Sequence, residues 1–89
     1  MMSGLGGDGF YHVFMRGSGE AVVFNGTGPA PRAATPERYA DGIALKGPLS
    51  FQTPGAVGAW GAMHKRFGRR PWASLFEAAI HYAQEGFGK

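Results

Sequence analysis

Few residues of this 89-residue chain have the types and spacing that catalysis requires. The chain has no cysteine, which excludes disulfides, thiolate zinc sites and cysteine nucleophiles. Glu77 and His81 lie one helical turn apart, but two ligands without a third in register do not make a metal site. Ser18 lies in a predicted turn and lacks the G-x-S-x-G sequence of a nucleophilic serine. We therefore expect no catalytic residue, metal site or cofactor within the chain.

The glycine-rich segment Gly4–Gly9 has the G-x-G-x-x-G spacing of loops that hold a nucleotide phosphate. Phosphate binding requires a strand before the motif and a helix after it, whereas here a predicted strand follows and no element precedes. Dinucleotide binding is therefore not expected. We interpret these glycines as residues that let the backbone reach the sheet by a path closed to residues with a Cβ atom.

One cluster of basic residues could bind nucleic acid or another anionic polymer. It consists of His64, Lys65, Arg66, Arg69 and Arg70. Because the cluster lies at the C-terminal end of a predicted helix, the helix dipole favours these cations without any partner. No aromatic residue lies among them on the same face to stack on a base, and the net charge is only +3. We favour the structural interpretation, so nucleic acid is not an expected partner.

The elements that must position these residues begin with a β-hairpin, predicted over residues 9–25. Two apolar runs, Phe10–Met15 and Ala21–Phe24, are joined by Gly17-Ser18-Gly19, a turn sequence. Since both runs are nearly continuous in apolar residues, we expect both faces of the hairpin to be covered. His12, inside the first run, is then expected to be a hydrogen-bonded core or interface histidine.

An irregular loop is expected over residues 25–35, followed by three helices over about 36–41, 54–67 and 71–85. Each helix begins next to a proline, and glycines end the last two, with Phe87 placed to contact Tyr82. Apolar residues at helical spacing give these two helices one buried side each; they are Ala56, Trp60, Met63 and Phe67, then Trp72, Leu75, Phe76, Ala79 and Ala83. The sequence therefore predicts an α+β fold with a helix layer on the hairpin.

Length and composition set outer bounds on these expectations. A chain of 89 residues with 44% hydrophobic residues forms at most one small domain with a thin core. Its apolar stretches are too short for a membrane span, and the first four residues do not begin a signal peptide. A cytoplasmic location is expected if the start is genuine. The start Met1-Met2-Ser3, which leads at once into a glycine cluster, also suggests a fragment or a shortened reading frame.

Several short motifs, taken in order, resemble one known family over essentially all 89 residues. They are Gly4–Phe10, the two strands, Ala30-Pro31 with Ala33-Ala34-Thr35, Pro54–Val57, His64–Gly68, Pro71-Trp72 and Ala83–Phe87. This series is similar to part of the large subunit of the gamma-glutamyltranspeptidase family, within the N-terminal-nucleophile hydrolases. The resemblance implies a single fragment, residues 1–89, of a four-layer αββα sandwich, with a hairpin from the central sheet and helices from one covering layer.

The resemblance also implies a parent enzyme that hydrolyses amides or transfers acyl groups. Members of this family are made as a precursor that cleaves itself, which frees a nucleophilic threonine at the start of the small subunit. None of Thr27, Thr35 and Thr53 matches that threonine, so this chain alone should be inactive. Its expected partners are the remainder of the large subunit and the small subunit.

One substrate-binding position of the family falls inside the chain. In true gamma-glutamyl enzymes an arginine, four residues before a loop proline, binds the substrate α-carboxylate. Counting back from Pro31 gives Thr27, so the arginine is missing and the chain resembles the divergent amidohydrolase or acylase-like branch. The expected substrate-binding residues are Thr27, Asn25 and, from the other side of Pro31, Arg32.

An alternative of a different class remains open at this point. The chain could be a small non-catalytic domain that binds a protein partner through its sheet edges, or an anionic polymer through Lys65–Arg70. Unpaired hairpin edges also predict self-association.

Overall fold

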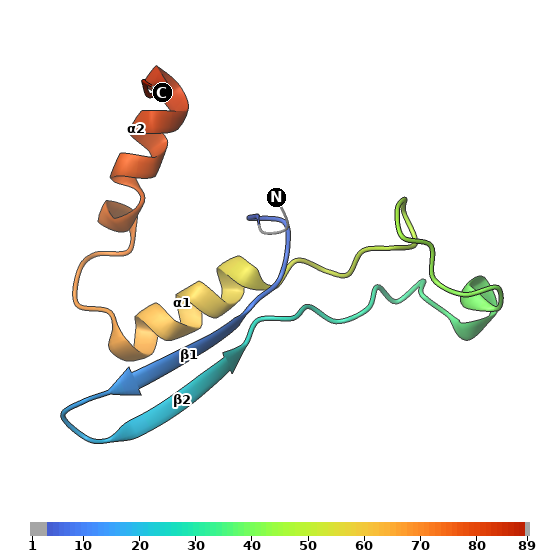
Figure 1. Ribbon diagram of the computed structural model, residues 1–89, viewed down its shortest axis with the longest axis horizontal. Helices are drawn as coiled ribbons and strands as arrows, with labels where there is room; N and C mark the ends of the chain where they lie inside the picture. Colours follow the sequence, from blue (N-terminus) through green and yellow to red (C-terminus); the bar gives the residue numbers. More distant parts are fainter. Residues whose placement is uncertain (1–3, 89) are drawn as a thin grey trace.

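The computed structural model describes residues 4–88, which adopt an α+β fold (Figure 1). Strands β1 (Phe10–Met15) and β2 (Glu20–Asn25) pair antiparallel as a hairpin. The elements that follow are the 3₁₀ helix η1 (Pro36–Tyr39), helix α1 (Ala56–Phe67), the 3₁₀ helix η2 (Ala73–Leu75) and helix α2 (Glu77–Glu85). Within the described residues the sheet has these two strands and no others.

The hairpin forms in the expected place, with Phe10 opposite Asn25 and Met15 opposite Glu20. Its turn is closed by the Met15 carbonyl, which accepts hydrogen bonds from the amides of Ser18 at 3.2 Å and Gly19 at 2.8 Å. Gly19 has φ +69°, a conformation that costs glycine little. The glycines of the turn sequence therefore do what the sequence predicts.

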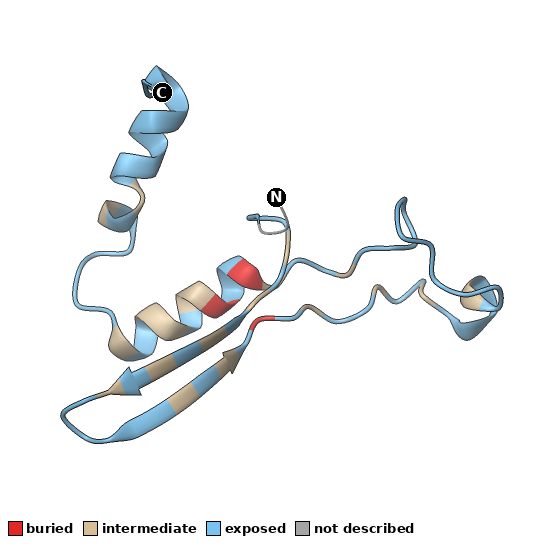
Figure 2. Cartoon of the chain, viewed as in Figure 1, coloured by how far each residue is buried: buried red, intermediate tan, exposed pale blue. Residues whose placement is uncertain are grey.

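Only one face of the hairpin is covered, so the expectation that both are covered is wrong (Figure 2). Helix α1 packs on that face, where the rings of Phe24 and Phe67 meet edge to face with centroids 6.1 Å apart. On the other face Phe10, Phe14 and Val23 are 69%, 64% and 64% exposed. His12 lies on this exposed face, not in a core, because the single helix packed on the hairpin can shield one side only.

Helix α1 begins at Ala56, two residues after the predicted start. The amides of Gly55 and Ala56 both donate to the carbonyl of Gly7 at 3.1 Å, so the glycine-rich segment satisfies the first free donors of the helix. At the other end Gly68 stops the helix, as its position predicts, and its amide donates to the carbonyl of His64 at 2.7 Å.

The last predicted helix, 71–85, is interrupted. The amides of Ser74, Leu75 and Phe76 bond three residues back, which winds η2 as a 3₁₀ helix, and α2 starts only at Glu77. The Ser74 hydroxyl also donates to the carbonyl of Pro71 at 2.8 Å and competes with α-helical bonding there. No residue of α2 is buried, and Figure 1 shows the helix pointing away from the hairpin. The predicted helix layer therefore consists of α1 alone.

The end of α2 follows the prediction more closely. Gly86 has φ +77°, its amide donates to the carbonyl of Tyr82 at 3.0 Å, and the rings of Tyr82 and Phe87 lie 6.2 Å apart. The short helix expected over 36–41 is a 3₁₀ turn over Pro36–Tyr39, begun by Thr35 as predicted.

The chain encloses very little core. Among the described residues, Gly26, Ala56 and Ala59 alone are buried. The accessible surface is 7765 Å², against about 5,000 Å² for a compact protein of this mass. The radius of gyration is 17.3 Å, against about 12 Å for a compact domain of this length. Large apolar surfaces are thus left open, and the core is thinner than composition suggested.

Candidate functional site

The loop that follows β2 is fixed by a close crossing with two other backbone segments, one before β1 and one before α1. The amide of Gly26 donates to the carbonyl of Gly9 at 2.8 Å, and the amide of Thr53 donates to the carbonyl of Pro29 at 3.1 Å. A Cβ atom on Gly28 would lie 1.4 Å from the carbonyl oxygen of Thr53, so this position admits glycine only. The crossing determines where the predicted site residues at the start of the loop lie.

The glycines of the N-terminal segment are less uniformly required than their sequence suggested. A Cβ atom on Gly4 or Gly6 would meet nothing within 4 Å, whereas one on Gly9 would lie 2.7 Å from the Tyr11 hydroxyl. The interpretation that they admit a path closed to other residues therefore fails at Gly4 and Gly6, and at Gly9 a side chain would have to displace the Tyr11 ring.

Asn25 and Thr27 form a hydrogen-bonded pair across the buried Gly26. The Oδ1 atom of Asn25 accepts from the backbone amide of Thr27 at 3.0 Å and from its hydroxyl at 2.5 Å. Because a backbone amide can only donate, the Asn25 atom that faces it must be the oxygen. Both donors of Thr27 are therefore used, and both side chains are exposed to an incoming group.

Arg32 is not brought to this pair. It is exposed, in a turn where the amide of Ala34 donates to the carbonyl of Pro31 at 2.8 Å. Within residues 4–88 its guanidinium makes no hydrogen bond or ion pair with Asn25 or Thr27. The structure thus joins two of the three predicted substrate-binding residues and leaves the third apart.

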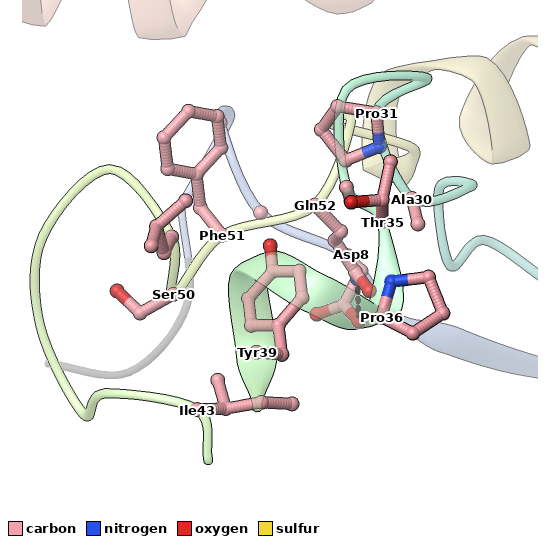
Figure 3. Close-up of a pocket in the computed structure, with 14 residues that line it drawn as sticks. Asp8, Ala30, Pro31, Thr35, Pro36, Tyr39, Ile43, Ser50, Phe51 and Gln52 are labelled. Carbon is pink, nitrogen blue, oxygen red and sulfur yellow. Dashed lines mark hydrogen bonds between the residues drawn. The ribbon is translucent and has the colours of Figure 1, made fainter. Parts of the chain in front are cut away.

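An open hollow of about 670 Å³, which the sequence did not indicate, lies beside the same loop (Figure 3). Its walls come from the N-terminal segment, the residues around η1 and the segment before α1. The lining residues are Gly6, Gly7, Asp8, Ala30, Pro31, Ala34, Thr35, Pro36, Tyr39, Ile43, Leu49, Ser50, Phe51 and Gln52. None of the predicted site residues lines it. The side-chain amide of Gln52 donates to the Asp8 carboxylate across the hollow.

At the rim of the hollow, the Thr35 side chain lowers the pKa of Glu37 by hydrogen bonding to its carboxylate, and the backbone amide of Glu37 adds to the effect. Glu37 is fully exposed, so this shift reports local structure near η1.

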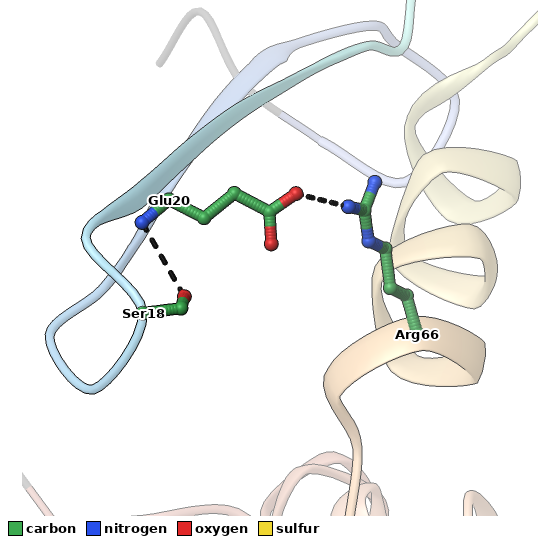
Figure 4. Close-up of polar contacts among 3 residues, drawn as sticks. All are labelled: Ser18, Glu20 and Arg66. Carbon is green, nitrogen blue, oxygen red and sulfur yellow. Dashed lines mark hydrogen bonds and ion pairs between the residues drawn. The ribbon is translucent and has the colours of Figure 1, made fainter.

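The basic cluster has structural roles in this fold (Figure 4). Arg66 forms an ion pair with Glu20 at the start of β2, with side chains 48% and 45% exposed, and its guanidinium lies 5.1 Å from the Phe67 ring centroid. The Nε2 atom of His64 donates to the carbonyl of Arg70 at 2.7 Å. The ion pair joins the end of α1 to the hairpin, and the His64 bond ties the helix end to the segment that follows it, which supports the structural interpretation of the cluster.

The other residues considered for chemistry stay apart. Glu77 and His81 both lie on the exposed helix α2, where the His81 ring tilts against Tyr82 with centroids 5.7 Å apart. Across residues 4–88, no three His, Asp or Glu side chains gather as a metal site would require. No helix in this part of the chain has the length and apolar character to cross a membrane.

Comparison with known proteins places the sequence in a family. The model of the family described as gamma-glutamyltranspeptidase matches residues 1–88. The chain is 38% identical over 89 residues to glutathione hydrolase 3 of Arabidopsis thaliana, covering 98% of this chain and 14% of that protein. It is 39% identical over 89 residues to the glutathione hydrolase-like YwrD proenzyme of Bacillus subtilis, covering 97% and 17%.

A third relative is the glutathione hydrolase proenzyme of Pseudomonas aeruginosa, 38% identical over 91 residues that cover 93% of this chain and 16% of that protein. The chain thus spans between 14% and 17% of the length of these three relatives. Because the family model runs over nearly the whole sequence, from the glycine-rich segment through the crossing to the end of α2, the chain belongs to the gamma-glutamyltranspeptidase family.

Proposed function

We propose that the chain acts as a large-subunit segment, residues 1–89, of a gamma-glutamyltranspeptidase-like amide hydrolase or acyltransferase. The observation that carries this proposal is the unfinished packing of a chain whose relatives are several times longer. The hairpin face with Phe10, Phe14 and Val23 and the whole of α2 are exposed. In the proposed assembly the remainder of the large subunit and the small subunit cover these surfaces within an αββα sandwich.

The chain supplies no nucleophile in this proposal. A threonine that uses its own amine as general base must be the first residue of a chain. Thr27, Thr35 and Thr53 are internal, and an amide nitrogen is not a base. The isolated chain is therefore expected to release no product from glutathione or a gamma-glutamyl anilide. Turnover that Thr27→Val abolishes would contradict this.

The Asn25–Thr27 pair is proposed to line the acyl pocket, where an arginine would bind a substrate carboxylate with two charged hydrogen bonds. Thr27 carries no charge, and both of its donors already bond to Asn25. A hydrogen bond to a charged group contributes about 1.5–3 kcal/mol, or about ten- to a hundredfold in affinity. We expect kcat/KM for gamma-glutamyl substrates to be lower by about this factor than in relatives that have the arginine.

The test places these 89 residues in the Pseudomonas aeruginosa proenzyme, in exchange for the matching stretch. It compares kcat/KM for a gamma-glutamyl amide and for the same amide without its α-carboxylate. Thr27→Arg should raise the preference for the carboxylate about ten- to a hundredfold, and Ser18→Arg, at the far end of the hairpin, should not. A strong carboxylate preference before mutation would refute the role of Thr27. Loss of that preference in Arg32→Ala would assign it to Arg32.

The exposed apolar face of the hairpin also favours a second candidate function, a non-catalytic module that binds a protein partner or a second copy of itself. Analytical sedimentation tests self-association. A stable monomer that also unfolds cooperatively would contradict self-association. Binding of an anionic polymer has less support, since Arg66 of the basic cluster is paired with Glu20.

A further inference from the structure

The hollow beside the loop is lined by three parts of this chain, and hydrogen bonds fix one side of it. The carbonyl of Gly7 accepts a hydrogen bond from the amide of Gly55 at 3.1 Å, and the carbonyl of Pro29 accepts one from the amide of Thr53 at 3.1 Å. Between these two anchors the Gln52 side chain bonds to Asp8. The N-terminal segment, the loop after β2 and the segment before α1 are thus tied together around one space.

The charge inside the hollow has a single sign. Of the lining residues that the structure describes, only Asp8 carries a full charge, and no lysine, arginine or histidine is among them. Among residues 4–88 the bond from Gln52 is the one side-chain hydrogen bond to this carboxylate, and it occupies one oxygen, so that the second oxygen can accept another. The lining therefore favours a group that donates hydrogen bonds and carries positive charge.

The rest of the lining is mostly apolar. Figure 3 shows Phe51 on one side of the space, Pro31 and Pro36 on the other, and the Tyr39 ring between them. Ile43 and Leu49 extend the apolar wall. The volume of about 670 Å³ is within the range of small-molecule sites, which combine apolar walls with a few polar groups that orient the ligand.

We propose that this hollow binds a small hydrophobic amine in its ammonium form. The ammonium group donates to the free oxygen of Asp8, and an aromatic or branched aliphatic body packs against Phe51 and Tyr39. An aromatic ring can also attract a nearby ammonium group through its π face, which adds to the preference at Tyr39. The site is separate from Asn25 and Thr27 and requires no nucleophile, so it stands independently of the proposed function.

The experiment titrates 4-fluorophenethylamine with the 89-residue chain and follows line broadening by fluorine NMR. Its charge-reversed partner, 4-fluorophenylacetate, is titrated in parallel. Saturable broadening is expected for the amine and not for the carboxylate. Asp8→Asn keeps an oxygen that Gln52 can reach but removes the charge, and should weaken amine binding at least about tenfold.

The matched control is Asp41→Asn, which removes an exposed carboxylate beyond η1 that does not line the hollow. It should leave amine binding unchanged. Equal binding of amine and carboxylate, binding that survives Asp8→Asn, equal losses in the two variants, or no saturable binding would each overturn the proposal.

Discussion

Gly28→Ala should open the backbone crossing that positions the candidate site. The new Cβ would lie 1.4 Å from the carbonyl oxygen of Thr53 and 2.5 Å from its carbonyl carbon. Relieving this overlap requires a contact of at least 3.0 Å, so the two segments must separate. That separation breaks the bond between the amide of Thr53 and the carbonyl of Pro29. The neighbouring contacts of Gly26 and Gly55 would open with it.

The cost has two parts. Overpacking of a close contact costs about 1–3 kcal/mol, and a lost backbone hydrogen bond about 0.5–1.5 kcal/mol. Together they give about 1.5–4.5 kcal/mol, which corresponds to about 10- to 1,600-fold in a local opening equilibrium. In a chain with so few buried residues, this cost should melt the crossing while the hairpin hydrogen bonds remain.

Amide hydrogen exchange, measured by NMR, reports the opening of the crossing directly. The amide of Thr53, which donates to the loop, should lose protection in Gly28→Ala, and so should the neighbouring amide of Gly55, which donates to Gly7. The control is Gly58→Ala inside α1, where a Cβ would meet nothing within 4 Å and alanine should stabilise the helix by about 0.4–1 kcal/mol. Unchanged protection of Thr53 in Gly28→Ala, or an equal loss in both variants, would refute the reasoning.

Three further predictions concern the packing around α1 and the charges nearby. Trp60→Ala removes a half-buried aromatic side chain from α1 and should lower the free energy of unfolding by about 1.5–3 kcal/mol. Lys65→Ala changes an exposed residue and should alter it by less than about 0.5 kcal/mol, both measured by urea denaturation. Equal small effects would contradict the assigned helix face. Glu20→Gln removes an exposed ion pair and should cost less than about 1 kcal/mol, and a larger loss in the same assay would show that this pair is a main support. Thr35→Val should raise the pKa of Glu37 in a carbon-detected NMR titration, and an unchanged pKa in the variant would refute the assigned cause. Because the folded state lowers this pKa, the stabilisation is present above the ordinary value of 4.5 and is lost as the pH falls through the lowered pKa.

The sequence predicted elements wherever the signal was local. The Gly17-Ser18-Gly19 turn predicted the hairpin, and Gly68 predicted the end of α1. The break before α2 was missed because helical spacing of apolar residues does not register a serine hydroxyl that bonds to a nearby carbonyl. Coverage of the hairpin was misjudged for a different reason. An apolar strand face shows that something must cover it, but not that the cover belongs to the same chain.

The candidate site divides in the same way. The contact between Asn25 and Thr27 joins residues two apart and follows from the tendency of asparagine to bond to the amide two residues on. The hollow was missed because its walls meet only after folding, and the bond between Asp8 and Gln52 spans 44 residues. The segment before α1 had no periodicity that marked its apolar residues as one wall. Contacts between irregular segments that lie far apart in the chain leave no pattern in a single sequence.

In the proposed function, these residues form a working segment of a gamma-glutamyltranspeptidase-like enzyme. The most direct test uses the Pseudomonas aeruginosa proenzyme in which this chain replaces the matching stretch. Gel electrophoresis measures cleavage of this proenzyme, and hydrolysis of an amide substrate measures its activity. A second graft, with the matching stretch of the Bacillus subtilis relative, shows whether the host tolerates replacement. We expect both grafts to be cleaved and active, and the Gly28→Ala form of this chain to be neither. Cleavage of the Bacillus graft together with a folded but uncleaved graft of this chain would contradict the claim.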